Sequence, residues 1–157
     1  MIEDALTGVQ SYISSNLTTY LDAIATARSV TIPRPLAADI KVGFVLSKQF
    51  PNISVVPADT EYEYSDPETP YVLPWQYHGV SVVIDHREGD ETTCMLVLAR
   101  YVEAITQMIL NDWTLGSTFN KVQLNGVEYG LLTAHDDKTI SQSVDIALMV
   151  RIKSTQT

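Results

Sequence analysis

Apolar residues recur at steps of three and four over the first part of the chain, which predicts an amphipathic helix. Glu3 and Asp4 lie in its first turn and Arg28 lies near its end, where each charge complements the helix dipole. Pro33 and Pro35 prevent the helix from continuing. The apolar stripe of this helix consists of Ile2, Leu6, Val9, Ile13, Leu17, Leu21 and Ile24.

A second helix is predicted in the middle of the chain. Asp90 or Thr92 can cap its start, and Glu91 falls in the first turn. Trp113 closes its apolar stripe, and Gly116 is a suitable stop. The stripe contains Leu98, Val102, Ile105 and Ile109, reinforced by Met95, Tyr101 and Met108.

Strict alternation near the C-terminus predicts a half-buried antiparallel strand over residues 143–153. At this length the strand extends roughly 35 Å, beyond the usual strand. One face carries Val144, Ile146, Leu148, Val150 and Ile152. The other face carries Ser143, Asp145, Ala147, Met149, Arg151 and Lys153.

The remaining strands are shorter in the sequence pattern. Residues 75–84 predict a strand, and residues 53–56 predict a short one that Pro57 ends. Residues 122–124 and 127–129 flank Asn125 and Gly126, a pair that predicts a hairpin. Residues 36–50 fit either a short helix or a strand.

An acidic segment lies between the two strands 53–56 and 75–84. It contains five acids and no base, with Tyr62 and Tyr64 alternating among them, so part of it fits an extended strand. Three prolines after residue 66 favour an irregular loop, and we expect residues 59–74 to protrude as an exposed acidic loop. Its acids are Asp59, Glu61, Glu63, Asp66 and Glu68.

The order of these elements is helix, strands, helix, strands. Both helices need a surface on which to bury their stripes, and one sheet provides it. We therefore expect a single α+β domain over residues 1–157, a two-layer sandwich of a mainly antiparallel sheet with two principal helices packed on it. Residues 154–157 form a polar tail that should fray.

Composition narrows the classes of partner. The 157 residues carry a formal net charge of −9, from 19 acids and 10 bases, which disfavours tight binding to a phosphate backbone. No uninterrupted apolar run approaches the ~20 residues of a membrane span, and the acidic start is unlike a signal peptide. One cysteine, Cys94, cannot form an internal disulfide, which fits a reducing compartment.

Candidate catalytic groups are sparse. Asp85-His86 and His135-Asp136-Asp137 place carboxylates beside imidazoles, but none of the three histidines has the spacing of metal ligands. We expect histidines in exposed turns and Cys94 as a small buried apolar residue. The sequence predicts no catalytic residue, cofactor or metal, and no glycine-rich phosphate loop.

The arrangement resembles the tail terminator, or tail completion, proteins of long-tailed bacteriophages. The resemblance rests on the first helix, the segment 50–57, the acidic segment 61–64, the helix that carries residues 101–105, and the amphipathic final strand. It implies a virion protein without catalytic residues, assembled in the host cytoplasm. Members of this family form a ring, commonly of six subunits. The ring caps the tail tube, stops polymerisation of the tube and offers a face to the head-side connector or stopper protein.

This interpretation predicts subunit or partner contacts at the edges and outer face of the sheet. Genomic DNA would only pass through the ring, and acids suit a channel in which DNA must not stick. Alternatives are a head-completion or stopper protein of the neck, a small hydrolase using Asp85, His86 or His135, and a non-viral binding module using the tyrosine-rich loop. The candidate interface residues are Asp59, Glu61, Glu63, Asp66, Glu68, Asn125, Gly126, Ala147, Met149 and Arg151.

Overall fold

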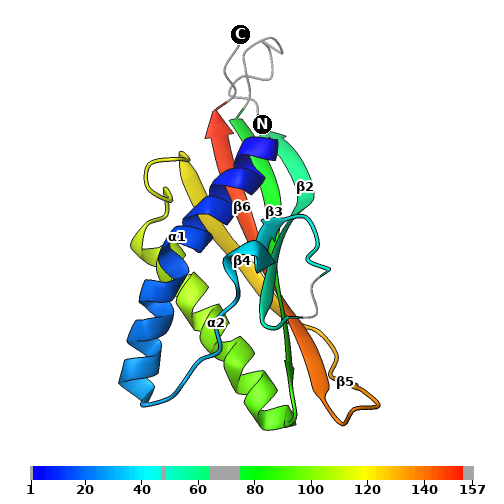
Figure 1. The fold of residues 1–157 in the computed structure, drawn as a ribbon. Coiled ribbons are helices and arrows are strands. Elements are labelled where there is room, and N and C mark those ends of the chain that lie inside the picture. Colours follow the sequence, from blue (N-terminus) through cyan, green and yellow to red (C-terminus); the bar gives the residue numbers. More distant parts are fainter. Residues whose placement is uncertain (1, 47–48, 64–74, 154–157) are drawn as a thin grey trace.

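A computed structural model describes residues 2–46, 49–63 and 75–153 (Figure 1). Two long helices and a six-stranded sheet account for most of these residues. In chain order the elements are α1 (Ile2–Arg28), the 3₁₀ turn η1 (Ala37–Asp39), β1 (Ile40–Val42), β2 (Asn52–Glu63), β3 (Trp75–Glu88), α2 (Glu91–Asn111), β4 (Lys121–Tyr129), β5 (Thr133–Ala134) and β6 (Ile140–Lys153).

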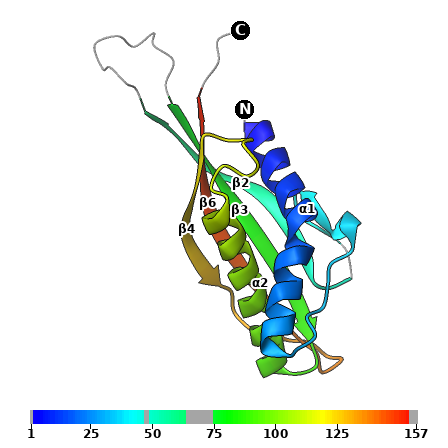
Figure 2. The same ribbon diagram turned by 90° about the vertical axis from the view of Figure 1, so that its left-hand side faces the viewer.

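The sheet has the order β1-β2-β3-β6-β4, and β5 pairs with the first two residues of β6. Every pairing is antiparallel except that of β1 with β2. Both helices lie on the same face of the sheet (Figure 2). Helix α1 contacts β1, β2 and β3, whereas α2 contacts β3, β6 and β4. The expected α+β two-layer sandwich is therefore confirmed.

The core lies between this sheet face and the two helices. The predicted stripe of α1 is buried from Leu6 to Ile24, with Ile2 partly buried. Strand β6 alternates as expected, since Val144, Ile146 and Val150 are fully buried. Helix stripes and strand faces thus meet in one continuous apolar cluster.

Helix α2 begins as predicted and ends earlier than predicted. The Asp90 carboxylate caps it by accepting a hydrogen bond from the Thr93 backbone N–H at 2.8 Å. The helix ends at Asn111, so Trp113 lies outside it and is 55% exposed, and Met95 points away from the core. By length and composition α2 could cross a membrane, but here eight of its residues are buried in the core.

The Asn125-Gly126 hairpin prediction is wrong. These residues lie inside the single strand β4, where the register with β6 shifts between Leu124 and Gly126. Because β6 is long enough to pair with both halves of this run, the pair forms a β-bulge in place of a turn. The actual hairpin joins β5 to β6 through a polar turn at residues 135–138.

Pro57 does not end its strand. Strand β2 continues to Glu63, and its register with β3 shifts between Pro57 and Thr60. Strand β1 pairs with β2 only as far as Val55, so in the described part of the chain the outer side of β2 beyond Val55 has no partner strand. A proline is tolerated on such an edge because the missing N–H removes no ladder bond there. Within the ambiguous range 36–50, Ala37–Asp39 form the 3₁₀ turn and Ile40–Val42 form β1.

Candidate assembly surfaces

The sheet face opposite the helices is open along β3 and β6, whereas at β2 the segment after β1 covers Ser54 on this face. Along β3 and β6 the residues on this face are half-exposed, while their neighbours on the helix face are buried. Figure 2 shows that β2 and β3 also extend past the helix layer toward the end where β6 finishes. This open face carries three of the predicted interface residues, Ala147, Met149 and Arg151.

Arg151 anchors an aromatic cluster on the open face. Its guanidinium lies 3.8 Å from the ring centre of Trp75 and 5.7 Å from that of Tyr77. Tyr77 is directly opposite Glu61 on one side and Arg151 on the other, and Arg151 is directly opposite Lys121. The fold therefore places predicted residues from β2 and β6 in one row across the sheet.

A second group of predicted residues meets between β4 and β6. Gly126 lies directly opposite Ala147, and Gln123 lies directly opposite Met149. A Cβ atom added at Gly126 would meet nothing within 4 Å, so the surface above the bulge is open. The bulge at Asn125 and the outer residues of β6 thus form one contiguous patch.

The acidic segment is only partly a loop. Asp59 and Glu61 are exposed on strand β2, and Glu63 is the last residue of that strand. Alternation with tyrosines was the correct signal for this part, because the three prolines all lie beyond the end of the strand. Asp66 and Glu68 lie outside the described residues.

Exposed apolar side chains gather at the two edges of the sheet, a feature that the sequence analysis missed. On the β1 side, Val42 is 40% exposed, and Phe44 and Leu46 follow it with exposures of 65% and 91%. On the β4 side, Val127 is 37% exposed and Tyr129 is 47% exposed. The pattern alone could not show this, because Val127 and Tyr129 alternate with Glu128 and so also fit the buried face of a strand.

An apolar groove also follows the β4 edge. It lies between the end of α2 and β4, and its volume is about 470 Å³. Leu110 and Trp113 stand on its rim with exposures of 70% and 55%, and Val122 and Leu124 lie along β4. Apolar surfaces of this kind on a small domain typically mark an interaction site.

The histidine prediction was wrong for two of the three. His78 and His86 are buried on the helix face of β3, with 3% and 2% exposure. Nε2 of His78 lies 3.0 Å from Gln76 Oε1, and Nε2 of His86 lies 2.9 Å from Glu88 Oε1. Burial lowers the pKa of His78, which favours the neutral imidazole.

The other two candidate catalytic residues, His135 and Cys94, lie in a hydrogen-bonded turn and in the core. His135 does lie in the turn, with Nε2 2.7 Å from Ser141 Oγ. Cys94 is buried as predicted, and burial raises the pKa of its thiol. Among the described residues, no group of three or more His, Cys, Asp or Glu side chains is placed to hold a metal ion.

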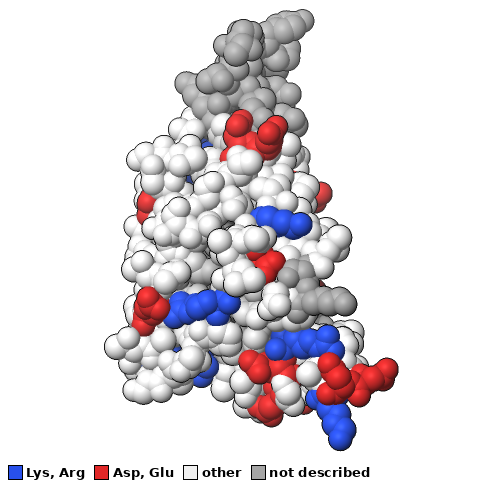
Figure 3. Space-filling view, in the orientation of Figure 1, with Lys and Arg blue, Asp and Glu red and all other residues white. Residues whose placement is uncertain are grey.

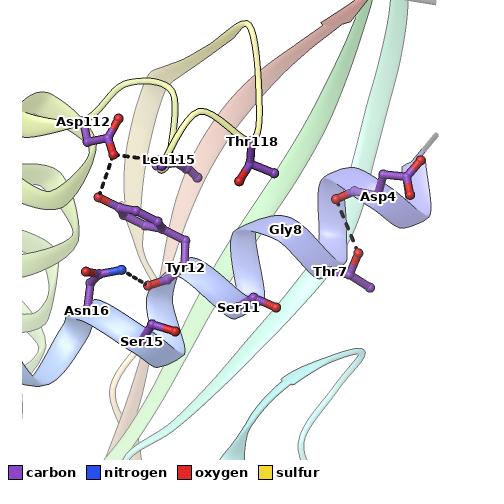
Figure 4. A pocket seen from close by; sticks show the side chains of 11 residues that line it. Asp4, Thr7, Gly8, Ser11, Tyr12, Ser15, Asn16, Asp112, Leu115 and Thr118 are labelled. Carbon is purple, nitrogen blue, oxygen red and sulfur yellow. Dashed lines mark hydrogen bonds between the residues drawn. The ribbon is translucent and has the colours of Figure 1, made fainter. Parts of the chain in front are cut away.

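A shallow polar hollow lies beside the first half of α1 (Figure 4). In this hollow the Asp112 carboxylate accepts hydrogen bonds from the backbone N–H of Gly116 at 2.6 Å, from the Thr114 hydroxyl and from the Tyr12 hydroxyl. The hydrogen bond from Thr114 is the main cause that lowers the pKa of Asp112. This carboxylate holds the loop after α2 in shape, so it is poorly suited to act as a catalytic base.

The helix-covered side has a mixed surface. Figure 3 shows acids and bases scattered over it, mostly toward the lower end of the view. Two ion pairs lie at α1 and the segment that follows it, Arg28 with Glu103 at 2.8 Å and Arg34 with Asp22 at 2.7 Å. Exposed pairs of this kind contribute little to stability.

Comparison with known proteins gives little. No known protein family matches the chain, and no curated protein matches it. Among solved structures, the chain is similar to one described as "Virion of native gene transfer agent (GTA) particle". The match has 8% sequence identity and a TM-score of 0.31, and it covers 90% of this chain and 95% of that chain. At this level of similarity the match carries no argument.

Proposed function

We propose that the protein is a structural component of a phage-like virion, of the tail terminator kind, without a catalytic step. In this role it forms a ring, with six subunits as the expected number, at the head-side end of the tail tube. The ring stops polymerisation of the tube protein and joins the tail to the connector or stopper protein. The support comes from the residues that resemble this family and from the two open edges of the sheet.

The observation that carries the proposal is the pair of unlike, open sheet edges. One edge is formed by β1 and the outer part of β2, and the other by β4. Both edges expose apolar side chains, which a monomer would have to leave in water. Because the two edges differ, a contact between them is head-to-tail, and such contacts form a ring when the rotation closes.

The acidic end of the β2–β3 pair fits the same role. Asp59 and Glu61 are exposed, and β2 pairs with β3 through this region. Repeated around a ring, these carboxylates would create a negative surface at one radius. Such a surface repels the DNA backbone, which suits a passage through which genomic DNA must slide.

Deletion of the gene from the producing phage tests the role. A terminator that is missing leaves tail tubes of uncontrolled length that do not join heads, seen by electron microscopy. Tails of normal length beside unjoined, DNA-filled heads would contradict the terminator role and favour a stopper in the neck. Complete, normal particles would contradict any structural role at the neck.

A further inference from the structure

The register between neighbouring strands shows which residue of one sheet edge lies at the same height along the strands as a given residue of the other edge. This height is called the level of the residue. Directly opposite residues form rows that run from one edge to the other, and their side chains point to the same face. A row on the open face begins at one edge with a base and ends at the other with an acid. It runs through Lys41, Ser54, Val83, Asp145 and Glu128.

The adjacent row, on the helix face, has valine at both edges. Val42 and Val127 are its ends, and they are 40% and 37% exposed. Between these ends the row runs through Val55, Val82 and Ile146. The two edges therefore match at neighbouring levels, charge against opposite charge and apolar against apolar.

A third row, near the end of β2, repeats the complementarity with the signs reversed. It starts at the exposed acid Glu61 on β2 and ends at the exposed base Lys121 on β4. Strand β1 does not reach this level, so the gap to a neighbouring β4 is about 10 Å, twice the strand spacing. Extended lysine and glutamate side chains can span that gap.

Strand direction agrees with such a contact. Strand β4 runs opposite to β6, whereas β6, β2 and β1 run in the same direction. A second copy placed beside the first in the same orientation therefore brings β4 antiparallel to β1. In that ladder Glu128 faces Lys41 while Val127 faces Val42, because one strand descends as the other ascends.

We propose that β4 of one copy pairs with β1 of a second copy in this register, extending one sheet across the subunit boundary. This contact rests on the proposed ring, and it names the surface that builds it. A slip of one residue would place a valine opposite a charge and turn side chains to the wrong face, so the pattern fixes the register as well as the partner.

Two charge reversals, Lys41→Glu and Glu128→Lys, test the contact. Each variant alone places like charges opposite each other at every boundary. We expect each to weaken assembly by about tenfold or more, because a favourable pair becomes a repulsive one. Assembly is measured by native mass spectrometry of the purified chain and by incorporation into particles in cells that lack the wild type.

An equimolar mixture of the two variants gives the decisive result. In an alternating ring of even number, the glutamate at residue 41 of one variant meets the lysine at residue 128 of the other. The second boundary is then the wild-type pair of Lys41 with Glu128. We expect the mixture to assemble like the wild type, which a folding defect in either chain cannot produce. The mixture also has the mean net charge of the wild type, so an effect of net charge is excluded by separate control variants.

Matched controls are Lys138→Glu and Asp136→Lys in the exposed β5–β6 turn, which change net charge equally outside the two strands of the proposed contact, β1 and β4. They should assemble normally. The contact is overturned if the edge variants assemble like these controls, or if the mixture fails while circular dichroism shows that each chain is folded. In either case a wild-type ring leaves the proposed function intact. A wild type that forms no ring alone or in particles overturns the proposed function itself.

Discussion

The two faces of β6 behave differently although they alternate along the same strand. On the helix face, Val144, Ile146 and Val150 are fully buried. On the open face, Asp145, Ala147 and Arg151 remain half-exposed. The helix face holds the fold together, and the open face with its two edges is available for contacts with other chains.

The largest expected effect comes from a charge on the helix face. Leu148 is 2% exposed, and Leu148→Asp would bury a carboxylate in the apolar core. We expect a loss of about 4 kcal/mol in the free energy of unfolding, a large share of the roughly 5–15 kcal/mol that stabilises a typical domain. Thermal unfolding followed by circular dichroism measures it.

The neighbouring substitution on the open face is its control. Ala147→Asp should keep the fold, with a change of about 1 kcal/mol or less, and should weaken assembly. Equal destabilisation by both substitutions would show that the open face is also part of the core.

Glycine substitutions sharpen the comparison within the open side of the sheet. A Cβ atom at Gly79 would lie 2.6 Å from the backbone oxygen of Asp59, so Gly79→Ala forces β2 to shift. We expect a loss of about 1–3 kcal/mol in urea unfolding. Gly126→Ala, where the added atom meets open space, should change stability by less than about 0.5 kcal/mol. A reversed order would contradict the close approach of β2 to β3 at Gly79.

The fold follows from local patterns where one face of an element is buried. The α1 stripe, the β6 alternation and the Asp90 cap were all predictable for that reason. The bulge at Asn125 and the continuation of β2 through Pro57 were not, because both depend on the length of a partner strand distant in sequence. The matching of Lys41 with Glu128 was also hidden, since it follows from the register of four strand pairings.

A smaller effect concerns Asp85 on the open face. Burial raises the pKa of this carboxyl above its usual value. Its ionised form is therefore disfavoured in the folded state, and the associated stability is present below about pH 4 and lost as the pH rises through the folded pKa. Asp85→Asn should raise the melting temperature at pH 7 and lose this advantage at pH 3. A lower melting temperature at pH 7 would show that the ionised carboxylate has a stabilising partner.

The smallest effect, with the opposite sign, concerns Asp137 in the β5–β6 turn. Hydrogen bonds from the side chain and backbone of Thr139, together with Arg87, lower the pKa of Asp137 to about 2. Its contribution to stability is present above about pH 4 and is lost as the pH falls through the folded pKa of about 2. Asp137→Asn should slightly lower the melting temperature at pH 7 and make no difference near pH 1. A difference that persists near pH 1 would assign the effect to something other than ionisation.

Electron cryomicroscopy of the native particle tests the assembly role of the open edges. We expect a closed ring of this chain at the head-side end of the tail tube, with β4 of each copy beside β1 of the next. Copies in which both edges face solvent, or the absence of the chain from the particle, would contradict it.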